Sequence, residues 1–407
     1  MLDLRIKNDF PIFKNNPDLV YLDSGATSLK PRCVIDAVVN FYSCYTANIH
    51  RGDYDNSFIA SKEYDDTRKL VCKLLNNDDP DEIIFTSGTT ASINNLAYSY
   101  GLNILNKGDV ILTTLSEHAS DILPWFKVKE KTEAIIKYIP LNNDGTFNID
   151  NFKKVLNEGN VKIVALPLIS NVLGYINPIK EISKVAHEKG AIICVDGAQG
   201  VPHIKVDVKD LDIDFLSFSA HKMLGPSGVG VLYGKKELLD KMDPLFMGGG
   251  ANARFNKEGE IILKEIPTRF EAGTPNIEGV IGFKKALEYL LEIGMDNIEK
   301  HEKELGRYIV ERLSSLPNIE IYNPKTDCSI VSFNVKGIFA QDVGSYLNSF
   351  NIAVRTGNHC AKMLHNIIGA SETVRVSAYL YNDKEDIDKL YNALKDITLE
   401  KCIGAII

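Results

Sequence analysis

The feature that most constrains the fold is an alternation of short apolar runs with helical stretches between residues 80 and 235. The apolar runs are continuous, which is typical of strands buried on both faces of a parallel sheet. Right-handed crossovers place such strands side by side, with helices on both faces. The sequence therefore predicts an α/β fold with a mostly parallel central sheet. The predicted strands are 82–86, 110–114, 162–167, 191–195, 214–218 and 230–233.

The pattern changes after residue 280, where helices and strands mix without the earlier alternation. A chain of 407 residues also exceeds what one compact core ordinarily holds. We therefore expect a large α/β domain at 21–285, and a smaller α+β domain formed by 1–20 and 286–407. The elements expected after residue 280 are helices near 281–293, 342–348 and 386–394 and strands near 329–334 and 374–377.

Polar side chains follow five of the predicted strands. In open α/β sheets, ligands bind beyond the carboxyl ends of the strands. Chance would place one or two chemically able segments at this edge, and five indicate a binding site. The five segments are 87–90, 117–118, 170–171, 196–199 and 219–222.

The last of these segments carries Lys222 after a buried strand. Desolvation at the mouth of a strand lowers the pKa of a lysine and frees its amine for Schiff-base chemistry. Ser219 and His221 beside it are suitable donors to a phosphate. Together they indicate a lysine that holds pyridoxal phosphate. The alternative is an ordinary surface lysine.

Other strand-end residues suit the same cofactor. Thr89 and Thr90 lie at the start of a helical stretch, where free N–H groups and hydroxyls bind anions. Asp196 follows an apolar strand and needs a cation, such as the protonated pyridine nitrogen. Gln199 is a candidate donor to the ring phenolate, and His118 is a candidate to stack on the ring and relay protons. The alternatives are helix caps, a loop amide and a structural histidine.

A second signal is the loop around Cys360. A nucleophilic cysteine needs an electropositive, partly exposed setting, and we expect Arg355 and His359 to supply the positive charge. Arg355 and Arg375 are also candidates to clamp a substrate carboxylate. Asn171 is a further candidate near the ring and substrate. The alternatives are internal salt bridges, a turn asparagine and an inert loop thiol.

Composition excludes several functional classes. The net charge of −8 argues against nucleic acid as a partner. No apolar run is long enough to span a membrane, and the first residues do not form a secretory signal, so we expect a cytoplasmic protein. The seven cysteines are scattered and form no C-x-x-C pair, so neither a disulfide framework nor a metal site is expected.

The motifs, taken in order, resemble those of the SufS-type (group II) branch of the pyridoxal-phosphate-dependent cysteine desulfurases, in the class V aminotransferase family. The lysine segment alone is similar to the whole family, whereas the cysteine loop and the FEAGTPN segment are more specific. The resemblance covers nearly the whole chain. Its main segments are YLDSGATSLKP at 21–31, NIHRG at 48–52, SGTTASIN at 87–94, SEHAS at 116–120, VDGAQG at 195–200, FSAHKMLGPSGVGVLYG at 218–234, RFEAGTPN at 269–276, RTGNHCA at 355–361 and RVS at 375–377.

The resemblance implies the fold type I architecture of pyridoxal-phosphate enzymes and a homodimer with sites near the subunit interface. The implied catalytic residues are Lys222, Cys360 and His118. The implied cofactor-binding residues are Thr89, Thr90, His118, Asp196, Gln199, Ser219, His221 and Lys222, with Thr274 of the partner subunit. The implied substrate-binding residues are Asn171, Arg355, Arg375 and His50.

The activity that the resemblance implies is conversion of L-cysteine to L-alanine, with a persulfide left on Cys360. A sulfur-acceptor protein then takes the outer sulfur, and iron–sulfur cluster assembly is the expected use. The alternatives are a selenocysteine lyase or another lyase of the same family, and a non-catalytic homologue that binds a partner.

Overall fold

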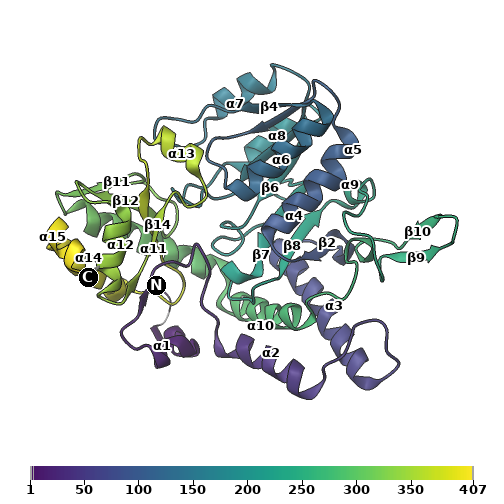
Figure 1. Ribbon diagram of the computed structural model, residues 1–407, viewed down its shortest axis with the longest axis horizontal. Helices are drawn as coiled ribbons and strands as arrows, with labels where there is room; N and C mark the ends of the chain where they lie inside the picture. The colour runs from purple at the N-terminus through teal and green to yellow at the C-terminus, as the bar shows by residue number, and fades with distance from the viewer. Residues whose placement is uncertain (1, 3, 406–407) are drawn as a thin grey trace.

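A computed structural model of the protein describes residue 2 and residues 4–405. Its largest element is a seven-stranded sheet with the order β2-β8-β7-β6-β5-β3-β4 (Figure 1). All six strands predicted in this region are confirmed, with ends that differ by one residue at most. The strands are β2 (Ile83–Thr86), β3 (Val110–Thr113), β4 (Ile135–Tyr138), β5 (Val161–Pro167), β6 (Ile192–Asp196), β7 (Phe215–Ser219) and β8 (Gly230–Gly234).

Both faces of the sheet are covered, which explains the continuous apolar runs. Val164 and Leu166 of β5 lie in one core together with residues of α2, α3, α7, α8 and α10. Ile163 and Ala165, which alternate with them, lie in a second core with residues of α4 and α6. The helices are α2 (Arg32–Cys44), α3 (Asp55–Leu75), α4 (Thr89–Leu96), α6 (Ala119–Thr132), α7 (Ile149–Leu156), α8 (Ile179–His187) and α10 (Ile277–Ile293).

The sequence pattern did not predict two details of this sheet. β8 runs antiparallel to both of its neighbours, β7 and β2, so the sheet is mostly but not wholly parallel. β4 is an additional strand at the edge, parallel to β3. Ile135 is exposed and the other three residues are only partly buried, so β4 lacks the buried apolar run that identifies the central strands.

The C-terminal part contains a four-stranded antiparallel sheet with the order β11-β12-β15-β14. Helices pack against it around a separate apolar core that includes Phe333 and Leu390. This arrangement confirms the expected α+β character. The strands are β11 (Ile319–Ile321), β12 (Ile330–Val335), β14 (Arg355–Gly357) and β15 (Thr373–Ser377), and the helices are α11 (Met295–Ser314), α12 (Ala340–Asn348), α13 (Lys362–Ile367), α14 (Lys384–Lys395) and α15 (Leu399–Gly404).

The N-terminal residues contact both parts of the molecule. β1 (Val20–Tyr21) pairs in parallel with β13 (Ile352–Ala353). Phe10 packs its ring against Tyr289 of α10 and against Tyr381. The domain limits given above stay a prediction. The remaining short elements are η1 (Leu4–Asp9), α1 (Pro11–Asn15), η2 (Pro80–Glu82), η3 (Ala97–Gly101), α5 (Leu102–Ile104), η4 (Ala220–Lys222), α9 (Lys236–Leu239) and η5 (Thr268–Phe270).

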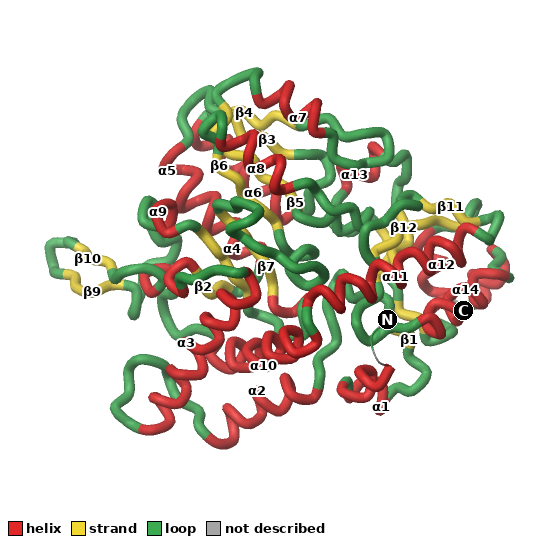
Figure 2. The backbone as a smooth tube through the Cα atoms, turned by 180° about the vertical axis from the view of Figure 1, so that it is seen from behind, coloured by secondary structure: helices red, strands yellow, loops and turns green. Residues whose placement is uncertain are grey.

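A hairpin of β9 (Asn252–Phe255) and β10 (Ile261–Leu263) projects away from the rest of the chain (Figure 2). Phe255, Ile261 and Ile262 are exposed on it. Elsewhere in the molecule, none of the described helices combines the length and apolar character that crossing a membrane requires.

Candidate active site

A cavity of about 210 Å³ lies at the carboxyl ends of β5, β6 and β7. Most of its wall comes from the strand-end segments of the large sheet. Two arginines of the C-terminal sheet, Arg355 and Arg375, complete it. The structure therefore brings together residues that lie far apart in the sequence. The predicted residues that line the cavity are Thr89, Thr90, His118, Asn171, Asp196, Gln199, Ser219, His221, Lys222, Arg355 and Arg375.

Lys222 and Asp196 both line this cavity, and their opposite charges influence each other. Lys222 lies on the short turn η4 that follows β7, and burial lowers its pKa to about 8, against the opposing effect of Asp196. Burial raises the pKa of Asp196, while Lys222 and the N–H of Ala198, 2.8 Å from Oδ1, favour its charged form. An amine with such a pKa is available as a base near neutral pH.

Hydroxyl groups and a helix start gather at another part of the wall. The Thr89 N–H donates to Oγ of Ser219 at 2.7 Å, and the two hydroxyl oxygens are also 2.7 Å apart. α4 begins at Thr89, so its first N–H groups face this region. Burial lowers the pKa of His221 to about 4, which leaves its ring neutral. Such a cluster of uncharged donors at a helix start is suited to an anion.

His118 caps the start of α6. Its Nδ1 accepts a hydrogen bond from the N–H of Ser120 at 3.1 Å, so the ring proton is on Nε2. Burial and then the charges of Lys222 and the arginines lower the pKa of His118 to about 4. The ring is therefore neutral near pH 7 and offers one N–H donor.

The two arginines lie directly opposite each other on the adjacent strands β14 and β15. Arg375 is only 2% exposed and donates from Nη1 to the carbonyl of Asn171 at 2.9 Å and from Nη2 to Asp23 Oδ1 at 3.0 Å. Its Nε is buried and has no partner among the residues that the structure describes. Asp23 is one carboxylate beside two guanidinium groups, so a net positive charge remains. This part of the cavity therefore suits a carboxylate ligand.

Asp23 was not predicted as a site residue, although it lies in the segment at 21–31 that the resemblance covers. Burial raises its pKa, and the charge of Arg375 opposes this effect. Its role depends on a partner 352 positions away in the chain, which no local sequence pattern reveals.

Cys360 lies on an exposed turn next to the cavity, not in its wall. Its φ of 58° and that of His359, 50°, are left-handed, an unfavourable conformation for residues with a side chain. The N–H of Ala119 donates to the carbonyl of Cys360 at 2.8 Å, which anchors the turn beside His118. His359, the preceding residue, lines the cavity, so the turn that carries Cys360 lies at its edge.

The expectation that His359 supplies positive charge to Cys360 is wrong. His359 is buried, and its Nε2 lies 2.8 Å from Oγ1 of Thr373. Burial lowers its pKa to about 2, so the ring is neutral. The positive charge near the turn comes instead from the two arginines, and His359 anchors the loop, since its carbonyl also accepts from Nδ2 of Asn171 at 2.8 Å.

Besides Cys360, two predicted residues do not line the central cavity. His50 lines a separate cavity of about 540 Å³, where its Nε2 is 3.5 Å from Asp65 Oδ1. Thr274 is exposed, and its neighbours Gly273 and Pro275 line the same cavity. The structure of one chain does not bring either residue to Lys222, and their roles stay predictions.

The segment around Thr274 is held by Glu271, which the sequence did not single out. Both carboxylate oxygens of Glu271 lie 3.0 Å from the guanidinium of Arg68, and Oε1 accepts from the Phe85 N–H at 2.7 Å. The side chains of Glu271 and Arg68 are each 9% exposed. This buried bidentate pair ties the loop to α3 and β2.

Residues 20–390 match the family model described as Aminotransferase class-V. Among curated proteins, the chain is 46% identical to a "Probable cysteine desulfurase" of Halalkalibacterium halodurans, over 96% of both proteins. It is 45% identical to a protein of the same name from Staphylococcus aureus, covering 95% of this chain and 94% of that protein.

Solved structures are similar over nearly the whole chain. The cysteine desulfurase CsdA from Escherichia coli superposes with a TM-score of 0.91 at 35% identity and covers 99% of both chains. A cysteine desulfurase from Thermococcus onnurineus superposes with a TM-score of 0.93 at 36% identity, covering 97% of this chain and 98% of the other. The fold class expected from the sequence is therefore confirmed.

Proposed function

The chain belongs to the class-V aminotransferase family, and from this premise we propose that it is a pyridoxal-phosphate-dependent cysteine desulfurase. The observation that carries the proposal is the convergence on one cavity of Lys222, Asp196 and the two arginines Arg355 and Arg375, with an exposed Cys360 at its side. The names of its relatives support the same substrate.

The residues of the cavity fit pyridoxal phosphate. Asp196 would hold the ring nitrogen, Gln199 the phenolate oxygen, and Thr89, Ser219 and His221 the phosphate. Thr90 and the ring of His118 complete this part of the wall. When bound, the cofactor supplies an electron sink for charge that develops on the substrate. The partner subunit's Thr274 would add a phosphate contact in a homodimer, which we also propose.

The chain's own groups have separate tasks. Arg375 and Arg355 bind the carboxylate of L-cysteine, and Asn171 fixes Arg375 through its carbonyl. The amine of Lys222 moves the α-proton, because its lowered pKa makes it a competent base. The thiolate of Cys360 forms an S–S bond to the substrate sulfur as the substrate C–S bond breaks. The electron pair of that bond stays with carbon, which takes up a proton to give alanine.

We further propose the SufS-type branch, because the cysteine loop at 355–361 and the segment at 269–276 carry its motifs. A sulfur-acceptor protein removes the outer sulfur of the Cys360 persulfide, and iron–sulfur cluster assembly is the use that we propose. The role of His50 in substrate binding and the cytoplasmic location stay predictions.

The test uses purified protein supplied with pyridoxal phosphate and L-cysteine. We expect cofactor absorbance and alanine formation in the wild type, and loss of both in Lys222→Ala. Cys360→Ala should keep the cofactor and lose alanine formation, whereas Cys44→Ala, at another exposed thiol, should match the wild type. Normal cysteine turnover by Cys360→Ala would overturn the nucleophilic role. Because selenium leaves more readily than sulfur, activity of Cys360→Ala on L-selenocysteine alone would favour a selenocysteine lyase.

A further inference from the structure

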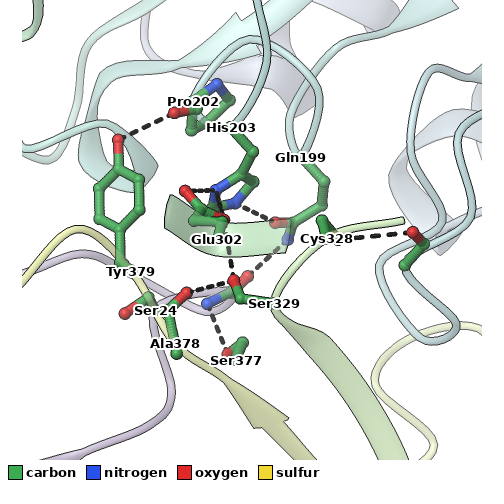
Figure 3. Close-up of polar contacts among 12 residues, drawn as sticks. Ser24, Gln199, Pro202, His203, Glu302, Cys328, Ser329, Ser377, Ala378 and Tyr379 are labelled. Atoms are coloured by element: carbon green, nitrogen blue, oxygen red, sulfur yellow. Dashed lines mark hydrogen bonds and ion pairs between the residues drawn. The ribbon is translucent and has the colours of Figure 1, made fainter. Parts of the chain in front are cut away.

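A chain of buried polar groups leads from α11 to the cavity residue Gln199 (Figure 3). His203 and Glu302 are each only 1% exposed. Nδ1 of His203 lies 3.0 Å from the carboxylate of Glu302, and Nε2 lies 3.3 Å from Oε1 of Gln199. At the far end, Oγ of Ser329 lies 2.8 Å from Glu302 Oε2 and 2.7 Å from the carbonyl of Ala378.

The hydrogen-bond partners fix the proton positions. The carbonyl of Gly25 can only accept, so the Gln199 atom 2.7 Å from it is the NH₂ group. Oε1 of Gln199 then faces His203 and can only accept, so Nε2 of His203 carries a proton and donates a hydrogen bond to it. Nδ1 of His203 lies 3.0 Å from both oxygens of the Glu302 carboxyl group, so a second proton lies between these two groups. Glu302 thus occupies Nδ1 and leaves Nε2 as the donor to Gln199.

The other titratable groups close to Glu302 are neutral near pH 7. Burial raises the pKa of Tyr379, Tyr381 and Cys328, each of which faces Glu302, so all three are neutral near pH 7. Burial lowers the pKa of His301, the neighbour of Glu302 on α11, which is also neutral. The edge of the His203 ring meets the ring of Tyr379, with 5.2 Å between centroids. A buried polar group without a hydrogen-bond partner is strongly disfavoured, so His203 and Glu302 hold each other in place.

We infer that His203 and Glu302 are positioning residues that act on the cofactor through Gln199. The Nε2–H group of His203 holds Oε1 of Gln199 and keeps the NH₂ group turned toward Gly25 and the cavity. One of the two N–H groups is used by Gly25, and the second is available to the phenolate oxygen of pyridoxal phosphate. The inference rests on the proposed function, because that oxygen belongs to the proposed cofactor. It also makes α11, a helix of the C-terminal part, a support of the cofactor ring.

Glu302→Gln tests the inference. The neutral amide introduced at position 302 binds Nδ1 of His203 less strongly than the carboxyl group does, so His203 is held less firmly against Oε1 of Gln199. The Gln199 amide is then fixed mainly by Gly25, and its second N–H is less well aimed at the phenolate oxygen. We expect the pH midpoint of the absorbance change of the bound cofactor to rise by about 1–2 units. We expect kcat to fall roughly tenfold or more, with little change in KM for L-cysteine. His301→Gln is the matched control, at an equally buried histidine of α11 that donates to Asn382 instead, and should leave the midpoint unchanged.

A double variant separates positioning from a purely structural role. In Gln199→Ala the amide is absent, so adding Glu302→Gln should move the midpoint by less than about 0.3 units. A further shift as large as the single variant's would overturn the inference. Ser329→Ala removes only one donor to Glu302 and covers the case in which Glu302→Gln does not fold. Ser329→Ala should raise the midpoint by a smaller amount than Glu302→Gln, and an unchanged midpoint would contradict the inference. A wild type that takes up no cofactor would refute the proposed function, whereas a normal wild type with an unshifted Glu302→Gln refutes this inference alone.

Discussion

Replacing Arg375 by lysine tests how the site recognises its substrate. Arg375 has five N–H donors, and the structure commits one Nη1 donor to Asn171 and one Nη2 donor to Asp23. Nε and two further donors remain for a carboxylate. A lysine keeps the charge, but its single ammonium group must serve Asp23, Asn171 and the substrate together.

The expected loss of activity in Arg375→Lys follows from the number of donors that remain for the substrate. Replacement of the planar fork by a point charge removes one of two charge-assisted hydrogen bonds to the substrate, at about 1.5–3 kcal/mol. This corresponds to a fall of roughly 10- to 150-fold in kcat/KM for L-cysteine. Uptake of pyridoxal phosphate should be unchanged, because Arg375 is not among the groups that we assign to the cofactor.

The assay compares alanine formation from L-cysteine with turnover of cysteamine, which has no carboxylate. The ratio of kcat/KM for L-cysteine to kcat/KM for cysteamine should fall sharply in Arg375→Lys, while cysteamine turnover changes by less than about threefold. Arg32→Lys, at a surface arginine whose side chain is 60% exposed, should match the wild type. An equal loss with both substrates, in a variant that unfolds at the normal temperature, would refute carboxylate recognition by Arg375.

Three further predictions concern buried charges. Glu271→Ala leaves the guanidinium of Arg68 buried without its partner and should lower the free energy of unfolding by about 3–5 kcal/mol in urea titrations; a loss below about 1 kcal/mol would contradict the buried pair. Burial raises the pKa of Asp121 to about 7, so the folded state holds its proton more tightly, and the stability this gives at low pH is lost as the pH rises toward 7. Asp121→Asn should therefore raise the melting temperature more at pH 8 than at pH 5, and an equal gain at both pH values would contradict this. With a pKa of about 4, His118 should not set the acid limb of the pH–kcat profile above pH 5, and an acid limb near pH 6.5 that disappears in His118→Gln would contradict its burial.

The sequence predicted the central strands and the strand-end residues because both depend on local patterns. Buried strands such as β5 and β6 are continuous apolar runs, and the chemistry follows directly at their ends. The direction of β8 could not be predicted, since an apolar run has the same composition in either orientation. β4 was not predicted, because an exposed edge strand has no continuous buried apolar run.

The parts of the site that the sequence did not reveal depend on distant partners. Asp23 matters because it meets Arg375, and Glu302 because it meets His203, 99 positions away. His359 was misjudged for a related reason. Its neighbours in the sequence suggest a charged loop, but the fold buries the ring, and burial removes the charge.

The central claim is that the thiol of Cys360 receives sulfur from L-cysteine. The most direct measurement is mass spectrometry of peptides from the cofactor-loaded protein, quenched after a single turnover without any acceptor. We predict that the peptide with Cys360 gains the mass of one sulfur atom, and that a reductant removes it. An unmodified Cys360 peptide beside a stoichiometric yield of alanine, or the added sulfur on the exposed Cys44 instead, would contradict the account.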